Sequence, residues 1–142
     1  WITNSEAGSS SGGQLYELEQ ARTLDNKATG LAEKAIAYVP RQCSDSTSCQ
    51  LHISFHGCQQ NSASIGNDYV KNGGFNEWAD KLNLVILYPQ VASGNPVNPL
   101  ACWDWWGYSG SDFHTQSGLQ IQAIKQLSDS LIAGTAKLTV SN

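Results

Sequence analysis

The sequence contains few charged residues, no methionine and no long hydrophobic run. Charged side chains make up 14% of its 142 residues and the net charge is −4, with lysine and arginine scattered, so the chain offers no basic field for nucleic acid. Its longest apolar run, "LVILY" at 84–88, is only as long as one strand, which excludes a membrane-spanning helix. Since even position 1 is not methionine, we expect a chain processed from a longer precursor.

The cysteines are not spaced as zinc ligands are, because no C-x-x-C pair occurs among the four of them. An even number of cysteines, low charge and many Ser, Asn and Gly residues favour a secreted protein with two disulfides over one with free thiols. The segment 43–49 is a polar, serine-rich loop of the kind that a local disulfide closes. Of the three connectivities that four cysteines allow, we predict Cys43–Cys49 and Cys58–Cys102.

The pattern of apolar residues predicts a single domain over residues 1–142, beginning with a glycine- and serine-rich surface lead-in at 1–13. A continuous apolar run such as 84–90 is typical of a strand buried on both faces of a parallel sheet. Strands and helices that alternate along the chain indicate an α/β fold with a mostly parallel sheet and flanking helices. We expect strands at 14–20, 33–40, 49–57 and 84–90, and helices at 73–83 and 117–134.

Residue details refine three of these elements. In the third strand, Leu51, Ile53 and Phe55 share one face, and the alternating residues share the other. Asn76 is the candidate N-cap of the first helix. In the second helix an apolar face is followed by Gly134, which we expect to end the helix. That face consists of Leu119, Ile121, Ile124, Leu127 and Leu131.

The segment "FHGCQQ", residues 55–60, is a candidate oxyanion-binding turn at the end of the third strand. Such a strand end carries main-chain N–H groups at the carboxyl edge of the sheet, and Gly57 permits a sharp backbone path there. In acyl-transfer hydrolases one oxyanion donor comes from a loop of this kind, and a second comes from the residue after the nucleophile. The alternatives are an ordinary turn with a disulfide cysteine and a buried, structural His56.

The loop "CWDWWGYSG", residues 102–110, places three tryptophans and one tyrosine within six positions. Trp and Tyr supply rigid, amphipathic contact area that suits stacking against a polymer chain. We expect Trp103 to pack inward over the Cys102 disulfide, and Trp105 and Trp106 to lie on the surface.

A nucleophile is not evident in the chain. The segment "GSSSG", residues 8–12, matches G-x-S-x-G with Ser10 at its centre, but it lacks the preceding hydrophobic strand and following helix of a nucleophile elbow. His52 and His56 share a strand face four residues apart, and neither they nor His114 have a carboxylate pair at a recognisable spacing. We therefore expect no metal site and no cofactor.

Four motifs in order, "HGCQQ", "NEWAD", "LYPQ" and "CWDWWGY", resemble the C-terminal half of extracellular polyhydroxybutyrate (PHB) depolymerases, whose α/β-hydrolase fold is circularly permuted. The similarity is densest over residues 38–132. It implies that the Cys58 amide completes the oxyanion hole, that Trp105 lines the substrate cleft, and that Cys58 is bridged to Cys102. We expect further substrate contacts from the neighbouring residues Trp106, Tyr108, His56 and Gln59.

In that family the Ser, Asp and His of the triad precede this region, so the resemblance implies that a companion N-terminal polypeptide carries them. The expected function is then part of a secreted serine-type ester hydrolase that degrades poly(3-hydroxybutyrate)-like polyesters, with no cofactor and no nucleic-acid or membrane partner. The alternative is a non-catalytic module that binds a polymer or polysaccharide through its tryptophan loop. A chain separated from its companion strands is expected to be poorly soluble or obligately paired.

Overall fold

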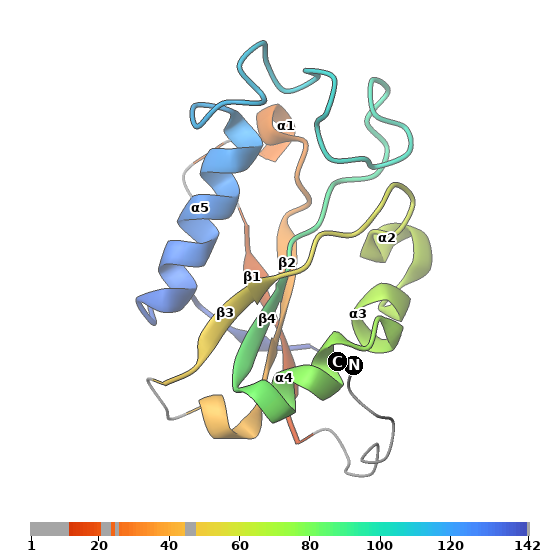
Figure 1. Cartoon of the computed structure of the whole chain (residues 1–142). Helices are drawn as coiled ribbons and strands as arrows, with labels where there is room; N and C mark the ends of the chain where they lie inside the picture. Colours follow the sequence, from red (N-terminus) through yellow and green to blue (C-terminus); the bar gives the residue numbers. More distant parts are fainter. Residues whose placement is uncertain (1–11, 21–23, 25, 45–47, 142) are drawn as a thin grey trace, which may run out of the picture.

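A computed structural model describes residues 12–20, 24, 26–44 and 48–141. In this part of the chain, a five-stranded sheet lies between helices on its two faces (Figure 1). No helix among the described residues has both the length and the apolar character needed to cross a bilayer.

The sheet is mixed. Its strands, in spatial order, are β3 (Gln50–Ile53), β4 (Leu84–Tyr88), β2 (Lys34–Val39), β1 (Gln14–Glu19) and β5 (Thr139–Val140). Only β3 and β4 are parallel, and the other three pairings are antiparallel. The expected α/β fold with flanking helices is present, but the sheet is not mostly parallel. Parallel neighbours need a long crossover, and between β3 and β4 the helical segment 54–83 provides one.

The helices form two layers (Figure 1). Three of them, α2 (Ser62–Ile65), α3 (Asp68–Asn72) and α4 (Phe75–Leu82), lie in the crossover on one side of the sheet. On the other side lie α1 (Asn26–Thr29) and the long α5 (Leu119–Ile132), and a short 3-10 turn, η1 (Arg41–Cys43), follows β2.

The central strands are buried on both faces because successive side chains of a strand point to opposite sides. Ile36 and Tyr38 of β2 pack with Ile86 and Tyr88 of β4 in a core beneath α3 and α4. The intervening residues face the other way, toward α5, in a second core made of Leu18, Ala35, Ala37, Leu87 and Leu127.

The sequence predicts the end of α5 correctly but not the N-cap of α4. Asn76 is not the N-cap of α4, since the helix begins at Phe75 after Gly74, whose φ is 79°. Asn76 is the second residue of α4, and its side chain donates to the Val70 carbonyl and accepts from the Tyr88 hydroxyl. At the end of α5, Gly134 follows the C-cap residue Ala133 and adopts a φ of 68°, as a stop signal should.

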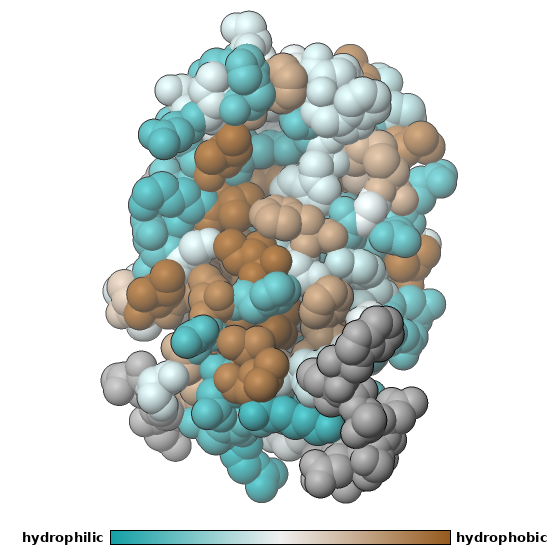
Figure 2. Space-filling model, viewed as in Figure 1, coloured by the Kyte–Doolittle hydropathy of each residue, from teal (hydrophilic) through white to brown (hydrophobic). Residues whose placement is uncertain are grey.

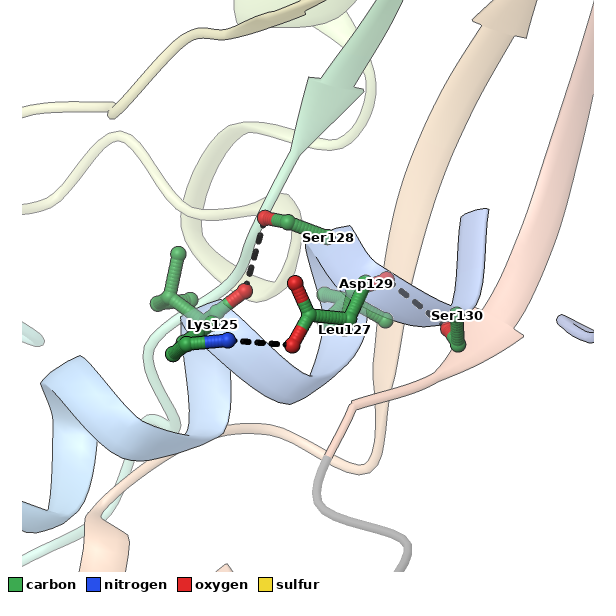
Figure 3. A network of polar contacts seen from close by, with 6 residues as sticks. Lys125, Leu127, Ser128, Asp129 and Ser130 are labelled. Carbon is green, nitrogen blue, oxygen red and sulfur yellow. Dashed lines mark hydrogen bonds and ion pairs between the residues drawn. The ribbon is translucent and has the colours of Figure 1, made fainter. Parts of the chain in front are cut away.

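Polar side chains on the second half of α5 form local contacts, which Figure 3 shows. Lys125 and Asp129 form an ion pair one turn apart, and the Ser128 hydroxyl donates to the carbonyl of Ile124 over 2.7 Å. On the inner face, Leu127 is buried in the core. Ile121, nearer the start of the helix, is 43% exposed, so the apolar face of α5 is incompletely covered at that end.

Candidate active site

Two loops meet at the carboxyl ends of the parallel strands β3 and β4. The first follows β3 and contains the turn 57–60, and the second runs from the end of β4 to α5. The Cys58–Cys102 disulfide joins them, while Cys43–Cys49 closes the distant polar loop. These are the two pairs that the sequence predicts.

In the turn 57–60, three of the four main-chain amides are already hydrogen-bonded. The Gly57 amide donates to Gln60 Oε1 over 2.8 Å, the Gln60 amide to the Gly57 carbonyl, and the Gln59 amide to the Leu100 carbonyl over 2.7 Å. The Cys58 amide has no acceptor among the described residues, and it lies beyond the end of β3 at Ile53. This amide is therefore free of the sheet ladder and available to another acceptor.

The residues next to the disulfide adopt an uncommon backbone conformation. Gln59, directly after Cys58, has a φ of 61°, and Ala101, directly before Cys102, has a φ of 49°. Left-handed conformations at residues other than glycine cost about 1–2 kcal/mol, so they persist only where the surroundings impose them. Both residues adjoin the Cys58–Cys102 disulfide, and the Gln59 amide is hydrogen-bonded to the Leu100 carbonyl, so the backbone next to Cys58 is held by both contacts.

His56 holds the turn in place from within the protein. Its side chain is only 2% exposed; Nδ1 donates to the Gly57 carbonyl over 2.7 Å, and Nε2 accepts from the Val91 amide over 3.2 Å. A carbonyl can only accept and an amide can only donate, so the ring is the neutral tautomer protonated on Nδ1. Burial lowers the pKa of His56, although the hydrogen bond to Gly57 opposes this. With both nitrogens used internally, His56 is not placed for the substrate contact expected from the sequence.

Trp103 connects the second loop to the first. Its indole nitrogen donates to the His56 carbonyl over 3.0 Å, and its ring lies edge-on to Phe55 at a centroid distance of 4.9 Å. The side chain is half-buried, in agreement with the expected inward packing.

Trp105 and Trp106 lie on the surface, 72% and 43% exposed, with their rings edge-to-face at 5.4 Å. Tyr108 supports them, since its ring lies 4.9 Å from that of Trp106. The Tyr108 hydroxyl donates to the Cys102 carbonyl and accepts from Gln120 Nε2, so it is occupied within the protein. Of the five substrate contacts expected from the sequence, Trp105, Trp106 and Gln59 are exposed, Tyr108 is half-buried and His56 is buried.

Asp104 is a residue of this loop that sequence reasoning missed. Its two carboxylate oxygens accept from the main-chain amides of residues 106–109 and from the Ser109 hydroxyl. Burial opposes ionisation of Asp104, but the hydrogen bonds from Ser109, Gly107 and Tyr108 outweigh it and lower the pKa of the carboxyl group. An Asp followed closely by Gly and Ser is a recognisable turn signal.

Beside the tryptophan loop lies a cleft of about 580 Å³, between Phe55 and the first turns of α5. Cys58 and Trp106 lie outside its lining. The polar side chains in the lining are Asp104, His114 and Gln120. Its apolar wall consists of Phe55, Trp103, Trp105, Phe113, Ile121 and Ile124.

The histidines do not assemble a triad. All three lie in the described part of the chain, and none is hydrogen-bonded to a serine there. His52 stacks on Phe75 of α4, whereas His114 lies beside Phe113 in the cleft on the α5 side of the sheet. Within the described residues no group of three His, Cys, Asp or Glu side chains could hold a metal ion. Ser10 lies outside the described residues.

No protein-family model matches the chain. Among curated proteins, the chain is 39% identical over 129 residues to a poly(3-hydroxybutyrate) depolymerase of Delftia acidovorans, an alignment that covers 89% of the chain and 25% of that protein. It is 37% identical over 118 residues to a polyhydroxybutyrate depolymerase of Talaromyces funiculosus, covering 75% of the chain and 35% of that protein.

Two solved structures contain the fold of this chain as one part. They are the PHB depolymerase from Penicillium funiculosum and a PHB depolymerase with one serine replaced by alanine, complexed with an R3HB trimer. Each superposes with a TM-score of 0.80 at 33% identity, covering 94% of this chain and 45% of the solved one. The expected resemblance to PHB depolymerases is confirmed, and the chain spans less than half the length of each relative.

Proposed function

We propose that this chain, which is similar to one part of the PHB depolymerases, is one part of a secreted serine-type hydrolase of poly(3-hydroxybutyrate)-like polyesters. It supplies one oxyanion-hole donor, the Cys58 amide, and an aromatic wall that includes Trp105 and Trp106. The nucleophilic serine, its histidine base and the orienting aspartate lie on a companion polypeptide. The serine attacks the ester carbonyl, the histidine takes its proton, and negative charge develops on the carbonyl oxygen.

The observation that carries the proposal is the unused amide of Cys58. In the turn 57–60 it alone has no described acceptor, and the disulfide to Cys102 fixes its position beside the tryptophan loop. A preorganised N–H of this kind stabilises a tetrahedral oxyanion without reorganisation, and loss of one such donor costs about 2.7–4 kcal/mol of transition-state stabilisation.

The aromatic wall suits a polyester, whose chain alternates ester groups with apolar carbons. Trp105 combines large exposure with a position in the lining of the apolar cleft, so one indole ring contacts solvent and cleft together. Large aromatic side chains of this kind dominate the energetics of contact surfaces.

The exposed edge of β3 gives the companion a place to dock. In the described part of the chain β3 pairs only with β4, so its other edge presents unpaired main-chain groups. Hydrophobic side chains gather over β3 and α5 in Figure 2, and Phe55 at the end of this strand is 49% exposed. A strand of the companion added to this edge would continue the sheet and bring its catalytic residues near Cys58.

The oxyanion assignment is tested by nuclear magnetic resonance on the complete protein, with every polypeptide that co-purifies. A phosphonate ester that modifies the catalytic serine places a charged oxygen where the oxyanion forms. We expect the Cys58 amide resonance to shift strongly. The Gln59 amide, which already donates to Leu100, is the internal control and should shift little. An unmoved Cys58 resonance in fully modified protein would reject the assignment.

The split active site is tested by reconstitution. Hydrolysis of soluble short-chain hydroxyalkanoate esters is measured with the chain, with the co-purifying polypeptide, and with both. We expect turnover only in the mixture. Polymer binding without ester turnover in any combination would instead establish the binding module that the surface position of Trp105 also suits.

The role of the wall is tested with Trp105→Ala and the matched control Trp78→Ala, since Trp78 lies on α4 and is 37% exposed. We expect Trp105→Ala to reduce the rate on polymer film about tenfold while Trp78→Ala has little effect, in line with the weight of aromatic anchors. Equal rates for the two variants would exclude the wall from substrate contact.

A further inference from the structure

The Asp104 carboxylate organises the segment that carries the exposed tryptophans. Oδ1 accepts from the Trp106 amide over 3.2 Å, from Gly107 over 2.6 Å and from Tyr108 over 3.1 Å. Oδ2 accepts from the Ser109 amide over 2.8 Å and from its hydroxyl over 2.6 Å. Five donors thus converge on one side chain, and the backbone of 106–109 curves around it.

This arrangement requires an ionised carboxylate. A carboxylate presents two accepting oxygens, whereas an asparagine amide presents one oxygen and one donating NH₂ group. Asparagine in the same place would face either the Ser109 donors or the Gly107 and Tyr108 amides with its own N–H groups. Hydrogen bonds to a charged acceptor are also roughly twice as strong as neutral ones.

Asp104 is itself anchored to the start of α5. The Asp104 amide donates to Gln120 Oε1 over 2.9 Å, which ties the residue to the first turn of α5. Trp105 lies between this anchored residue and Trp106, whose amide the carboxylate binds. Trp105 is 72% exposed and its ring lies edge-on to that of Trp106, so the direction of its ring depends on the backbone course of residues 104–106.

We infer that Asp104 is a positioning residue, which acts on the polymer through Trp105 and Trp106 by holding their backbone in the curve that presents both rings beside the cleft. The inference rests on the proposed function for the identity of the polymer. Its geometric part, the ordering of the tryptophan pair, is independent of any substrate.

The test compares Asp104→Asn with Asp112→Asn in the complete protein. Asp112 is exposed in the same connection, and its carboxylate accepts none of the described hydrogen bonds, so its replacement removes the same charge without touching the ring of donors. Near-ultraviolet circular dichroism reports the coupling of the Trp105–Trp106 pair, identified as the part of the spectrum lost in Trp105→Ala. Hydrolysis of polymer film and of a soluble short ester is measured alongside.

We expect Asp104→Asn to lose the pair signal and to reduce film hydrolysis about tenfold, the scale of a lost aromatic anchor, with the soluble ester changed by less than about twofold. Asp112→Asn should match the wild type in all three measurements. In a Trp105→Ala background, Asp104→Asn should reduce film hydrolysis by no further factor, because its effect runs through that ring.

A retained pair signal in Asp104→Asn would overturn the inference, and so would equal losses on film and on soluble ester, which indicate general damage to the fold. Should Asp104→Asn fail to fold, Ser109→Ala removes only the hydroxyl donor and should weaken the pair signal in part; no change in that variant would also contradict the inference. A wild-type protein without ester hydrolysis would instead reject the proposed function, while the dichroism would still decide the geometric part.

Discussion

The indole N–H of Trp103 donates to the main-chain carbonyl of His56 over 3.0 Å. The Cys58–Cys102 disulfide and the hydrogen bond from the Gln59 amide to the Leu100 carbonyl also join the loops that follow β3 and β4. The His56 ring adds a further link through the Val91 amide. The candidate oxyanion turn and the tryptophan loop therefore form one structural unit, in which a change on one side should be detected on the other.

Replacing Trp103 by phenylalanine should test this unit. The variant keeps an aromatic ring beside Phe55 but removes the donor to the His56 carbonyl. We expect the free energy of unfolding to fall by about 1–2 kcal/mol, because a partly buried acceptor loses its partner. We also expect the Cys58 amide resonance to move. Denaturant unfolding and amide spectra measure the two effects.

The matched control is Trp78→Phe on α4, which should leave the Cys58 resonance in place. If the Trp103 variant also leaves that resonance unchanged, the two loops are not mechanically linked in the way described.

His56 should make the stability of the protein depend on pH below about 6.5. Burial lowers its pKa from the ordinary value of 6.5, so below that pH the unfolded chain binds a proton that the native protein does not. The protein therefore has its full stability with respect to His56 above pH 6.5, and part of that stability is lost as the pH falls. We expect the free energy of unfolding to decrease by up to about 1.4 kcal/mol per pH unit in this range.

Denaturant unfolding between pH 5 and pH 7 measures this slope, and His56→Gln should flatten it. The lowered pKa of Asp104 acts in the same direction but only at more acidic pH, below the ordinary value of 3.8, so it does not interfere. An equal slope in wild type and His56→Gln would show that the buried ring is not the source.

Local sequence patterns predicted the elements that surround the site but not all the contacts within it. The double-sided burial of β4 follows from its continuous apolar run, and Gly134 marks the end of α5 because its positive φ suits glycine. The mixed sheet could not be predicted in this way, because strand direction depends on how the chain crosses over rather than on side-chain alternation.

The roles of single polar residues depend on distant partners and were harder to predict. Asn76 looks like a cap in the sequence, yet its partner is Tyr88, a residue of the sheet. His56 looks available for substrate, but the Val91 amide lies 35 residues away and occupies its free nitrogen. Asp104 lies among tryptophans that draw attention, although its own contacts are local and a turn signal was present.

The two disulfides should differ in their contribution to stability. Cys58–Cys102 spans 44 residues and Cys43–Cys49 spans 6, and a longer loop removes more entropy from the unfolded chain. The chain-entropy relation gives about 4 kcal/mol for the first bridge and about 2 kcal/mol for the second. Unfolding of Cys58→Ser/Cys102→Ser and Cys43→Ser/Cys49→Ser compares them directly. Only the first double variant should also shift the amide resonance of residue 58. A larger loss of unfolding free energy from the second double variant would contradict this account.

The exposed edge of β3 should make the chain self-associate in the absence of the companion polypeptide that we propose. Unpaired main-chain groups along β3 and the half-exposed Phe55 ring together form a surface on which another strand can add. Sedimentation velocity of the isolated chain should therefore show oligomers or aggregates that diminish when the companion is added.

Phe55→Lys places a charge at this edge and should reduce self-association and weaken the pairing with the companion, because both use the same strand. Val97→Lys is the control, since Val97 is similarly exposed, at 60%, but lies in the loop after β4. If the isolated chain sediments as a single monomer and melts cooperatively, the edge is not a docking surface, and the catalytic residues that we propose for the companion must reach Cys58 by another route.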